Sequence, residues 1–184
     1  MLLVLTVALT LIACRRKNDE TPDSSEQTGN AQQSQPATPL AGSMEENINT
    51  IMTQNPVEFM GGLMPVDLKD TSEDGKWALK NYTGFESPEK FTDIAVYEPM
   101  TGSQAFSLVL VRLAEGENTN AVARQMKEKI DPRKWICAGA DQVMAAGYQD
   151  VVMFIMLDSN LGKNAQSYVD TFAALCGGKL DFTI

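Results

Sequence analysis

The 184-residue sequence has no histidine, only three cysteines, and aromatic side chains at just 7% of positions. Without histidine the chain lacks the commonest general base, the usual activator of a serine or cysteine nucleophile, and the preferred protein ligand for zinc. Catalysis would have to use carboxylates, lysine, tyrosine or cysteine. We therefore expect no cofactor, no metal site and no enzymatic activity.

An excess of basic residues is also absent, since the formal net charge is −9 at pH 7. A surface of this sign repels a phosphate backbone, so we expect no nucleic-acid partner. The ten methionines offer soft thioether ligands for Cu(I). Met126, Met153 and Met156 fall on expected buried faces, however, where methionine fills irregular gaps. Only Met60, Met64 and Met100 lie in expected loops or short elements, and we expect no copper site.

One long apolar run is present, over residues 2–13, and it is too short to cross a bilayer, which needs about 20 residues. Its length suits a secretory signal peptide, with the small Ala13 at the cleavage position. A buried terminal element or an uncleaved signal anchor is a less favoured interpretation. No Lys or Arg precedes the run, which suggests that the natural chain begins earlier.

The run ends in Leu11-Ile12-Ala13-Cys14, which resembles the lipobox of bacterial lipoproteins. The resemblance implies that Cys14 becomes the mature N-terminus and carries a diacylglyceryl thioether with acyl chains such as palmitate. Two acyl chains hold a protein stably at a membrane. We therefore expect a lipid-anchored protein on the extracytoplasmic face of the cell membrane.

The next residues, up to 42, are polar, with almost no apolar side chain larger than alanine. Such a composition does not bury enough surface to offset its ordering entropy. The expected plan is a signal peptide over residues 1–13, a lipidated disordered tether over residues 14–42, and a single domain over residues 43–184.

The domain begins with helical signals. Ser43 and Glu46 form a capping box ahead of Ile48 and Ile51, and Asn55-Pro56 ends that helix. Residues 55–60 are typical of a second short helix stopped by Gly61-Gly62. Residues 77–82 suggest a strand.

A repeated order follows. Residues 91–97 and 105–113 alternate or run apolar as strands do, and residues 118–130 have one apolar stripe of a helix. Residues 142–146, 151–157 and 164–176 repeat the order strand, strand, helix, with Gly177 as a left-handed cap. Residues 180–184 alternate as an edge strand would. We predict an α+β fold: an antiparallel sheet built from two strand-strand-helix units, with the helices on one face, preceded by short N-terminal helices.

Four segments carry a family resemblance: residues 96–99, 102–107, 131–137 and 147–152, which include the Trp135-Ile136-Cys137 run. They are similar to a domain-of-unknown-function family of lipoproteins found mainly in Gram-positive anaerobes of the gut. The resemblance covers residues 44–180 and the signal. It implies a lipid-anchored surface protein and assigns no functional residues.

Two functional hypotheses remain. The first is a monomeric, non-catalytic envelope module that binds a peptide, glycan or partner protein through an uncovered sheet face carrying Asp93, Ala95 and Tyr97 or the opposite set. The second is an enzyme acting on cell-wall or secreted material through a carboxylate pair such as Glu98 with Asp150. The lack of histidine and of a nucleophile motif favours the first.

Three other groups of residues are candidate sites: an acidic loop, a set of aromatic residues and two cysteines. Asp67, Asp70, Glu73 and Asp74 form an acidic loop whose spacing does not follow the Ca²⁺-loop pattern. An aromatic cleft is a candidate site, although aromatic residues on a sheet usually belong to the core. Its members would be Tyr97, Phe106, Trp135 and Tyr148. For Cys137 and Cys176, topology favours two separate buried thiols over a disulfide, and both alternatives stay open.

Overall fold

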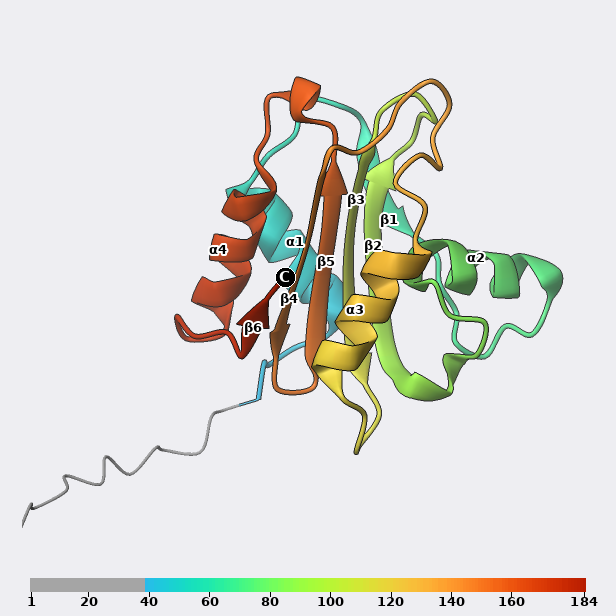
Figure 1. The fold of residues 1–184 in the computed structure, drawn as a ribbon, viewed down its shortest axis with the longest axis vertical. Helices are drawn as coiled ribbons and strands as arrows, with labels where there is room; N and C mark the ends of the chain where they lie inside the picture. The colour runs from blue at the N-terminus through green and yellow to red at the C-terminus, as the bar shows by residue number, and fades with distance from the viewer. Residues whose placement is uncertain (1–38) are drawn as a thin grey trace, which may run out of the picture. The chain divides into compact units, whose positions relative to one another are not determined.

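The computed structural model describes residues 39–184, so Cys14, the predicted signal peptide and most of the predicted tether lie outside the described residues (Figure 1). Residues 39–184 form one six-stranded antiparallel sheet with strand order β1-β2-β3-β5-β4-β6, and four α-helices. No helix in this part of the chain is long and apolar enough to span a membrane. The predicted α+β class is confirmed. The strands are β1 (Gly61–Met64), β2 (Phe91–Pro99), β3 (Phe106–Leu113), β4 (Gln142–Tyr148), β5 (Val151–Leu157) and β6 (Phe182–Thr183), and the helices are α1 (Met44–Gln54), α2 (Glu73–Thr83), α3 (Thr119–Lys129) and α4 (Ala165–Leu175).

The predicted strand-strand-helix repeat is present as β2-β3-α3 and β4-β5-α4. The two units meet where β3 and β5 pair antiparallel at the centre of the sheet, with Leu110 opposite Met153. Gly177 has the expected left-handed conformation, with φ at 74°. The predicted edge strand at the C-terminus is β6, which pairs with β4.

The helices lie on both faces of the sheet, so the prediction that they gather on one face is wrong. Helices α1 and α4 pack on one face, over side chains such as Leu110 and Met153, and α2 and α3 pack on the other, over Val109 and Phe154. Figure 1 shows α3 in front of the sheet and α1 behind it. The physical reason is that every residue of β5 is apolar and buried, which requires a cover on each side.

The sheet face expected to be free is therefore occupied. Ala95 is buried in the α1 and α4 core, and Tyr97 packs against that core edge-on to Phe106, with ring centroids 6.2 Å apart. The Asp93 carboxylate accepts a hydrogen bond of 2.8 Å from the Met44 N–H at the start of α1. These contacts rule out this face as the ligand surface.

The capping box before α1 is confirmed: the Ser43 side chain accepts from Glu46 N–H, and the Glu46 side chain accepts from Ser43 N–H. The predicted short helix over residues 55–60 is wrong, because this segment is irregular and leads into β1. A side chain at Gly61 would come within 2.7 Å of the Tyr97 ring, so the glycine serves close strand packing rather than a helix stop.

The predicted strand over residues 77–82 is also wrong, because these residues lie within α2. The Ser72 side chain caps this helix by accepting from Gly75 N–H, and Gly84 ends it with φ at 75°. Leu79, Tyr82 and Thr83 are buried at helical spacing, so tertiary packing selects the helix.

Candidate functional site

The carboxylate pair named as an example for the enzyme hypothesis, Glu98 with Asp150, does not form. Asp150 makes an ion pair of 3.1 Å with Arg112, which lies opposite Asp93 near the start of β2. Glu98 lies five residues after Asp93 on β2. At about 3.3 Å per residue, Glu98 is about 16 Å from Asp93 along the strand, and therefore also at the far end from the Arg112–Asp150 pair. Glu98 pairs instead with Lys134, at 2.6 Å. The enzyme hypothesis thus loses the one pair named for it.

The acidic loop, by contrast, forms a surface feature beside α2. Three of its carboxylates, those of Asp67, Asp70 and Asp74, line a groove of about 350 Å³, which we call the α2 groove. The fourth acid, Glu73, turns away to pair with Lys76 at 3.0 Å. The other lining residues are Pro65, Gly75, Trp77, Ala78 and Tyr82.

Local hydrogen bonds hold the acidic side of the groove. Asp67 accepts from the Lys69 N–H and Asp70 from the Ser72 N–H, both at 2.9 Å, which are turn contacts typical of aspartate. A side chain at Gly75 would come within 2.5 Å of Asp70, so glycine lets the loop pack directly on the first turn of α2.

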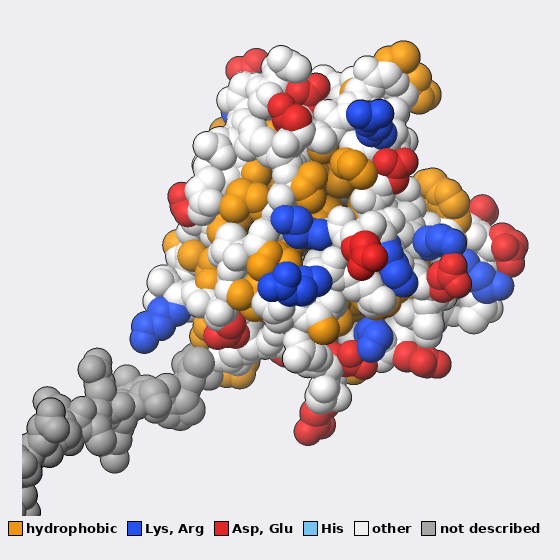
Figure 2. All heavy atoms as spheres, viewed as in Figure 1, with side chains coloured by type: hydrophobic (Ala, Val, Ile, Leu, Met, Phe, Trp, Pro, Cys, Tyr) orange, Lys and Arg blue, Asp and Glu red, His pale blue; other side chains and the backbone are white. Residues whose placement is uncertain are grey.

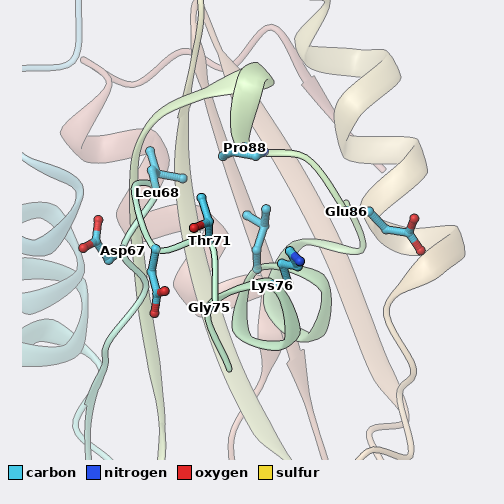
Figure 3. Close-up of a pocket in the computed structure, with 9 residues that line it drawn as sticks. Asp67, Leu68, Thr71, Gly75, Lys76, Glu86 and Pro88 are labelled. Atoms are coloured by element: carbon cyan, nitrogen blue, oxygen red, sulfur yellow. The ribbon is translucent and has the colours of Figure 1, made fainter. Parts of the chain in front are cut away.

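A second hollow of about 110 Å³ adjoins the groove and shares Asp67, Asp70 and Gly75 with it. Figure 3 shows that Leu68, Thr71 and Pro88 surround it, with Lys76 and Glu86 toward its other end. The α2 groove and this hollow together form one larger depression beside α2.

The aromatic side of the groove is formed by Trp77 and Tyr82. Trp77 is 63% exposed, and its ring stands edge-on to Tyr82 with centroids 6.3 Å apart. Tryptophan is seldom so exposed. Because Trp77 and the three carboxylates line the same groove, one ligand can contact both the ring and the acids.

No ion pair within residues 39–184 neutralises the acids of the α2 groove. The ion pairs among residues 39–184 do not include Asp67, Asp70 or Asp74. The neighbouring Lys76 and Lys80 are engaged with Glu73 and Glu86. Hydrogen bonds from the Ser72 side chain and backbone lower the pKa of Asp70. Figure 2 shows acidic and basic side chains mixed over the α2 part of the molecule.

A metal ion does not fit this arrangement well. Within residues 39–184, no three Asp, Glu or Cys side chains converge to hold one. The carboxylates are instead distributed along the rim beside an aromatic ring, which suits an organic cation such as a lysine or arginine side chain.

Beneath the groove, Tyr82 contacts a buried ion pair that the sequence patterns do not predict. The Lys134 ammonium lies 2.6 Å from Glu98 and 4.7 Å from the centre of the Tyr82 ring, and the two charged side chains are only 10% and 11% exposed. Burial lowers the pKa of Lys134, and the Glu98 charge opposes that shift. The contact with Lys134 therefore holds the Tyr82 ring in its position in the groove wall.

The remaining candidates divide between core and surface. Phe106, Tyr148 and Tyr97 belong to or pack on the core beneath α1 and α4, so they line no common cleft with Trp135, which packs on the opposite face. Met60 and Met100 are neighbours, joined by the Met100 N–H to Met60 C=O bond of 2.9 Å, and both are exposed. Met64 packs against the α2 and α3 core instead.

The two described cysteines are both free, which confirms two separate thiols, but only Cys176 is buried. Cys137 is exposed, contrary to the prediction, because it lies in the irregular segment between α3 and β4. The predicted lipidation site, Cys14, lies outside the described residues.

The chain matches no protein-family model, and searches of curated proteins and of solved structures found no significant match. The resemblance to lipoproteins of gut anaerobes stays a prediction.

Proposed function

We propose that this protein is a lipid-anchored, non-catalytic binding module of the cell surface, and that it binds a positively charged group of a partner protein or peptide in the α2 groove. The observation that carries the proposal is the set of three carboxylates, Asp67, Asp70 and Asp74, without a basic partner around the exposed Trp77. The resemblance of residues 11–14 to a lipobox supports the proposed location.

The physical basis is complementarity of charge and shape. A guanidinium or ammonium group placed on the face of Trp77 gains a cation–π contact of about 0.5–1 kcal/mol at an exposed site. Carboxylates at the rim add charge-assisted hydrogen bonds, which are about twice as strong as neutral ones. The net charge of −9 favours encounter with a basic partner from a distance.

A glycan is the weaker choice of ligand. The face of Trp77 would stack on a sugar ring, but a neutral sugar leaves the three carboxylates without an opposite charge. We therefore expect a Lys- or Arg-bearing polypeptide to bind more tightly than a neutral oligosaccharide.

The test is binding of a fluorescently labelled hexa-arginine peptide to the full-length protein in mild detergent, followed by fluorescence anisotropy. We expect Asp70→Asn/Asp74→Asn and Trp77→Ala each to weaken binding about tenfold, which is about 1.4 kcal/mol. The matched control is Glu115→Gln/Glu128→Gln, which removes the same charge from exposed acids outside the groove. Equal weakening by the control would show that only the overall charge matters and would refute the groove as the site.

A further inference from the structure

We propose, resting on the function above, that the partner is an extended polypeptide segment that pairs with the free edge of β1 and places a Lys or Arg side chain in the α2 groove. The sheet order makes β1 an edge strand, because within residues 39–184 only β2 pairs with it. An edge strand offers unpaired N–H and C=O groups in a pattern that an extended backbone satisfies.

The register identifies which groups are free. The Met60 C=O accepts from the Met100 N–H, so the Met60 backbone faces β2. Because backbone groups alternate in direction along a strand, Gly62 and Met64 also face β2, and Gly61 and Leu63 face outward. No hydrogen bond within residues 39–184 reaches the outward groups of Gly61 or Leu63.

This edge has few of the features that block strand addition. Residues 61–64 contain no charge, no proline and no bulge, and the two glycines leave the backbone bare. The opposite edge is different. There the edge strand is β6, which has only two residues, Phe182–Thr183, and so offers a shorter ladder than β1.

The edge leads directly into the groove. Pro65 follows β1 and is itself a lining residue of the α2 groove, together with Trp77 and Tyr82. A segment paired with Leu63 would pass Pro65 two residues later, about 7 Å further along. One of its side chains therefore reaches the three carboxylates while its backbone is held by β1.

The end of β1 farther from Pro65 is apolar. Met60 and Met100 are 74% and 66% exposed, and a side chain at Gly62 would lie 3.5 Å from the tip of Met100. Methionine surfaces adapt to different apolar partners. The expected ligand thus combines an apolar residue with a basic residue on one extended segment. Only two residues of β1 face outward, so we expect modest affinity.

The test compares two labelled peptides on the full-length protein in mild detergent: Val-Arg-Val-Arg-Val-Arg and the same peptide with alternate backbone nitrogens methylated. Methylation removes ladder donors and leaves the charge unchanged. We expect methylation to weaken binding at least tenfold. We also expect amide hydrogen exchange at Gly61 and Leu63 to slow when the unmethylated peptide is bound, with little change at Gly62 and Met64, which already face β2.

A protein variant tests the same edge. Leu63→Pro removes an outward N–H, and Leu63→Ala controls for the lost side chain. We expect Leu63→Pro to bind at least fivefold more weakly than Leu63→Ala, with both folded by circular dichroism. The peptide comparison uses the unmodified protein and so does not depend on folding of either variant.

The outcomes separate the two proposals. If both peptides bind equally, Asp70→Asn/Asp74→Asn weakens both, and Gly61 and Leu63 exchange as before, strand addition is refuted and the proposed function stands. If neither peptide binds, both proposals fail. If Gly61 and Leu63 become protected without peptide as protein concentration rises, the occupant is a second copy of this chain, and the inference of a foreign segment is wrong.

Discussion

Lys134 and Glu98 join three parts of the molecule at a place with little access to water. Glu98 belongs to β2, Tyr82 belongs to α2, and Lys134 belongs to the irregular segment after α3. The Lys134 ammonium also lies 3.4 Å from the Asn81 C=O. The pair thus holds this segment against the sheet and supports the floor of the α2 groove.

Removing one member of the pair should be costly. Lys134→Ala leaves the Glu98 carboxylate buried without its partner, and we expect the free energy of unfolding to fall by about 3 kcal/mol. Urea unfolding measures the loss. In the paired control, Lys134→Met/Glu98→Leu, both charges are replaced by apolar groups, and we expect most of the stability to return. A single variant as stable as the wild type would contradict the role given to this pair.

Tyr82 and Tyr168 predict a loss of stability at alkaline pH. Burial raises the pKa of each to about 12, with smaller contributions from the charges of Glu98 and Tyr97 respectively. Because the pKa of tyrosine in the unfolded chain is about 10, the unfolded state loses its protons first as pH rises. Their stabilising contribution is complete below about pH 10 and is lost as pH approaches 12.

The measurement is urea unfolding at pH 9 and pH 11. We expect each tyrosine to account for about 1 kcal/mol of the loss at pH 11. Tyr82→Phe and Tyr168→Phe should each make the decrease smaller. Burial also raises the pKa of Cys176 to about 12, so the difference between wild type and each variant, rather than the total loss, is the relevant quantity. An unchanged decrease in both variants would refute the assignment.

At the scale of elements, α2 carries the proposed binding surface and depends on its cap. The Ser72 side chain accepts from the Gly75 N–H at 3.1 Å, and Ser72 also contributes to the turn at Asp70. We expect Ser72→Ala to destabilise the protein by about 1 kcal/mol and to weaken peptide binding. Urea unfolding and fluorescence anisotropy test the two effects.

Ser87→Ala provides the matched control. Its side chain accepts only a long contact of 3.4 Å, from the Glu89 N–H in a three-residue turn of 3-10 helix. We expect a stability change within about 0.5 kcal/mol and unchanged binding. If Ser72→Ala behaves like this control, the cap does not position the groove.

Comparing the observed helices and strands with the sequence shows which features of the fold the sequence patterns predict. The order of β2 to α4 could be predicted because apolar spacing along each segment records which side is buried. The placement of helices on both faces was missed, although β5 carried the signal: seven consecutive apolar residues indicate burial on both sides. Alternation along β2 does not distinguish a solvent-exposed face from a face covered by the polar start of a helix, where Asp93 accepts from the Met44 N–H.

The helix α2 was missed for a different reason. Trp77 and Tyr82 have high strand propensity, whereas burial decides the outcome: Leu79 and Tyr82 belong to a core cluster with residues distant in sequence, such as Val96 and Met126. The α2 groove was only partly predictable. The sequence places four acids together, but it does not show that Glu73 turns to Lys76 while the others share a groove with Trp77.

At the scale of the whole molecule, the net charge of −9 and the predicted lipid anchor both agree with the proposal of a protein that acts at a surface. Leu40, in the irregular residues before α1, is held to β3, because its C=O accepts from the Arg112 guanidinium at 2.8 Å. Arg112 also binds Asp150, at the turn between β4 and β5. Glu98 lies toward the other end of β2, so Leu40 and Glu98 are at opposite ends of the sheet.

Lipidation of Cys14 can be tested by counting thiols. In protein purified without reductant from a bacterial host that modifies lipoproteins, we expect two thiols after denaturation, from Cys137 and Cys176, because the Cys14 sulfur is held in a thioether. Before denaturation only Cys137 should react quickly, since Cys176 is buried and its pKa is raised to about 12.

The matched variant is Cys14→Ala, which should give the same two thiols but leave the membrane fraction, because the two acyl chains that hold the protein there are absent. A count of three thiols in the unmodified sequence would show that Cys14 is free. Retention of Cys14→Ala in the membrane fraction would show that something other than a lipid on this cysteine anchors the protein.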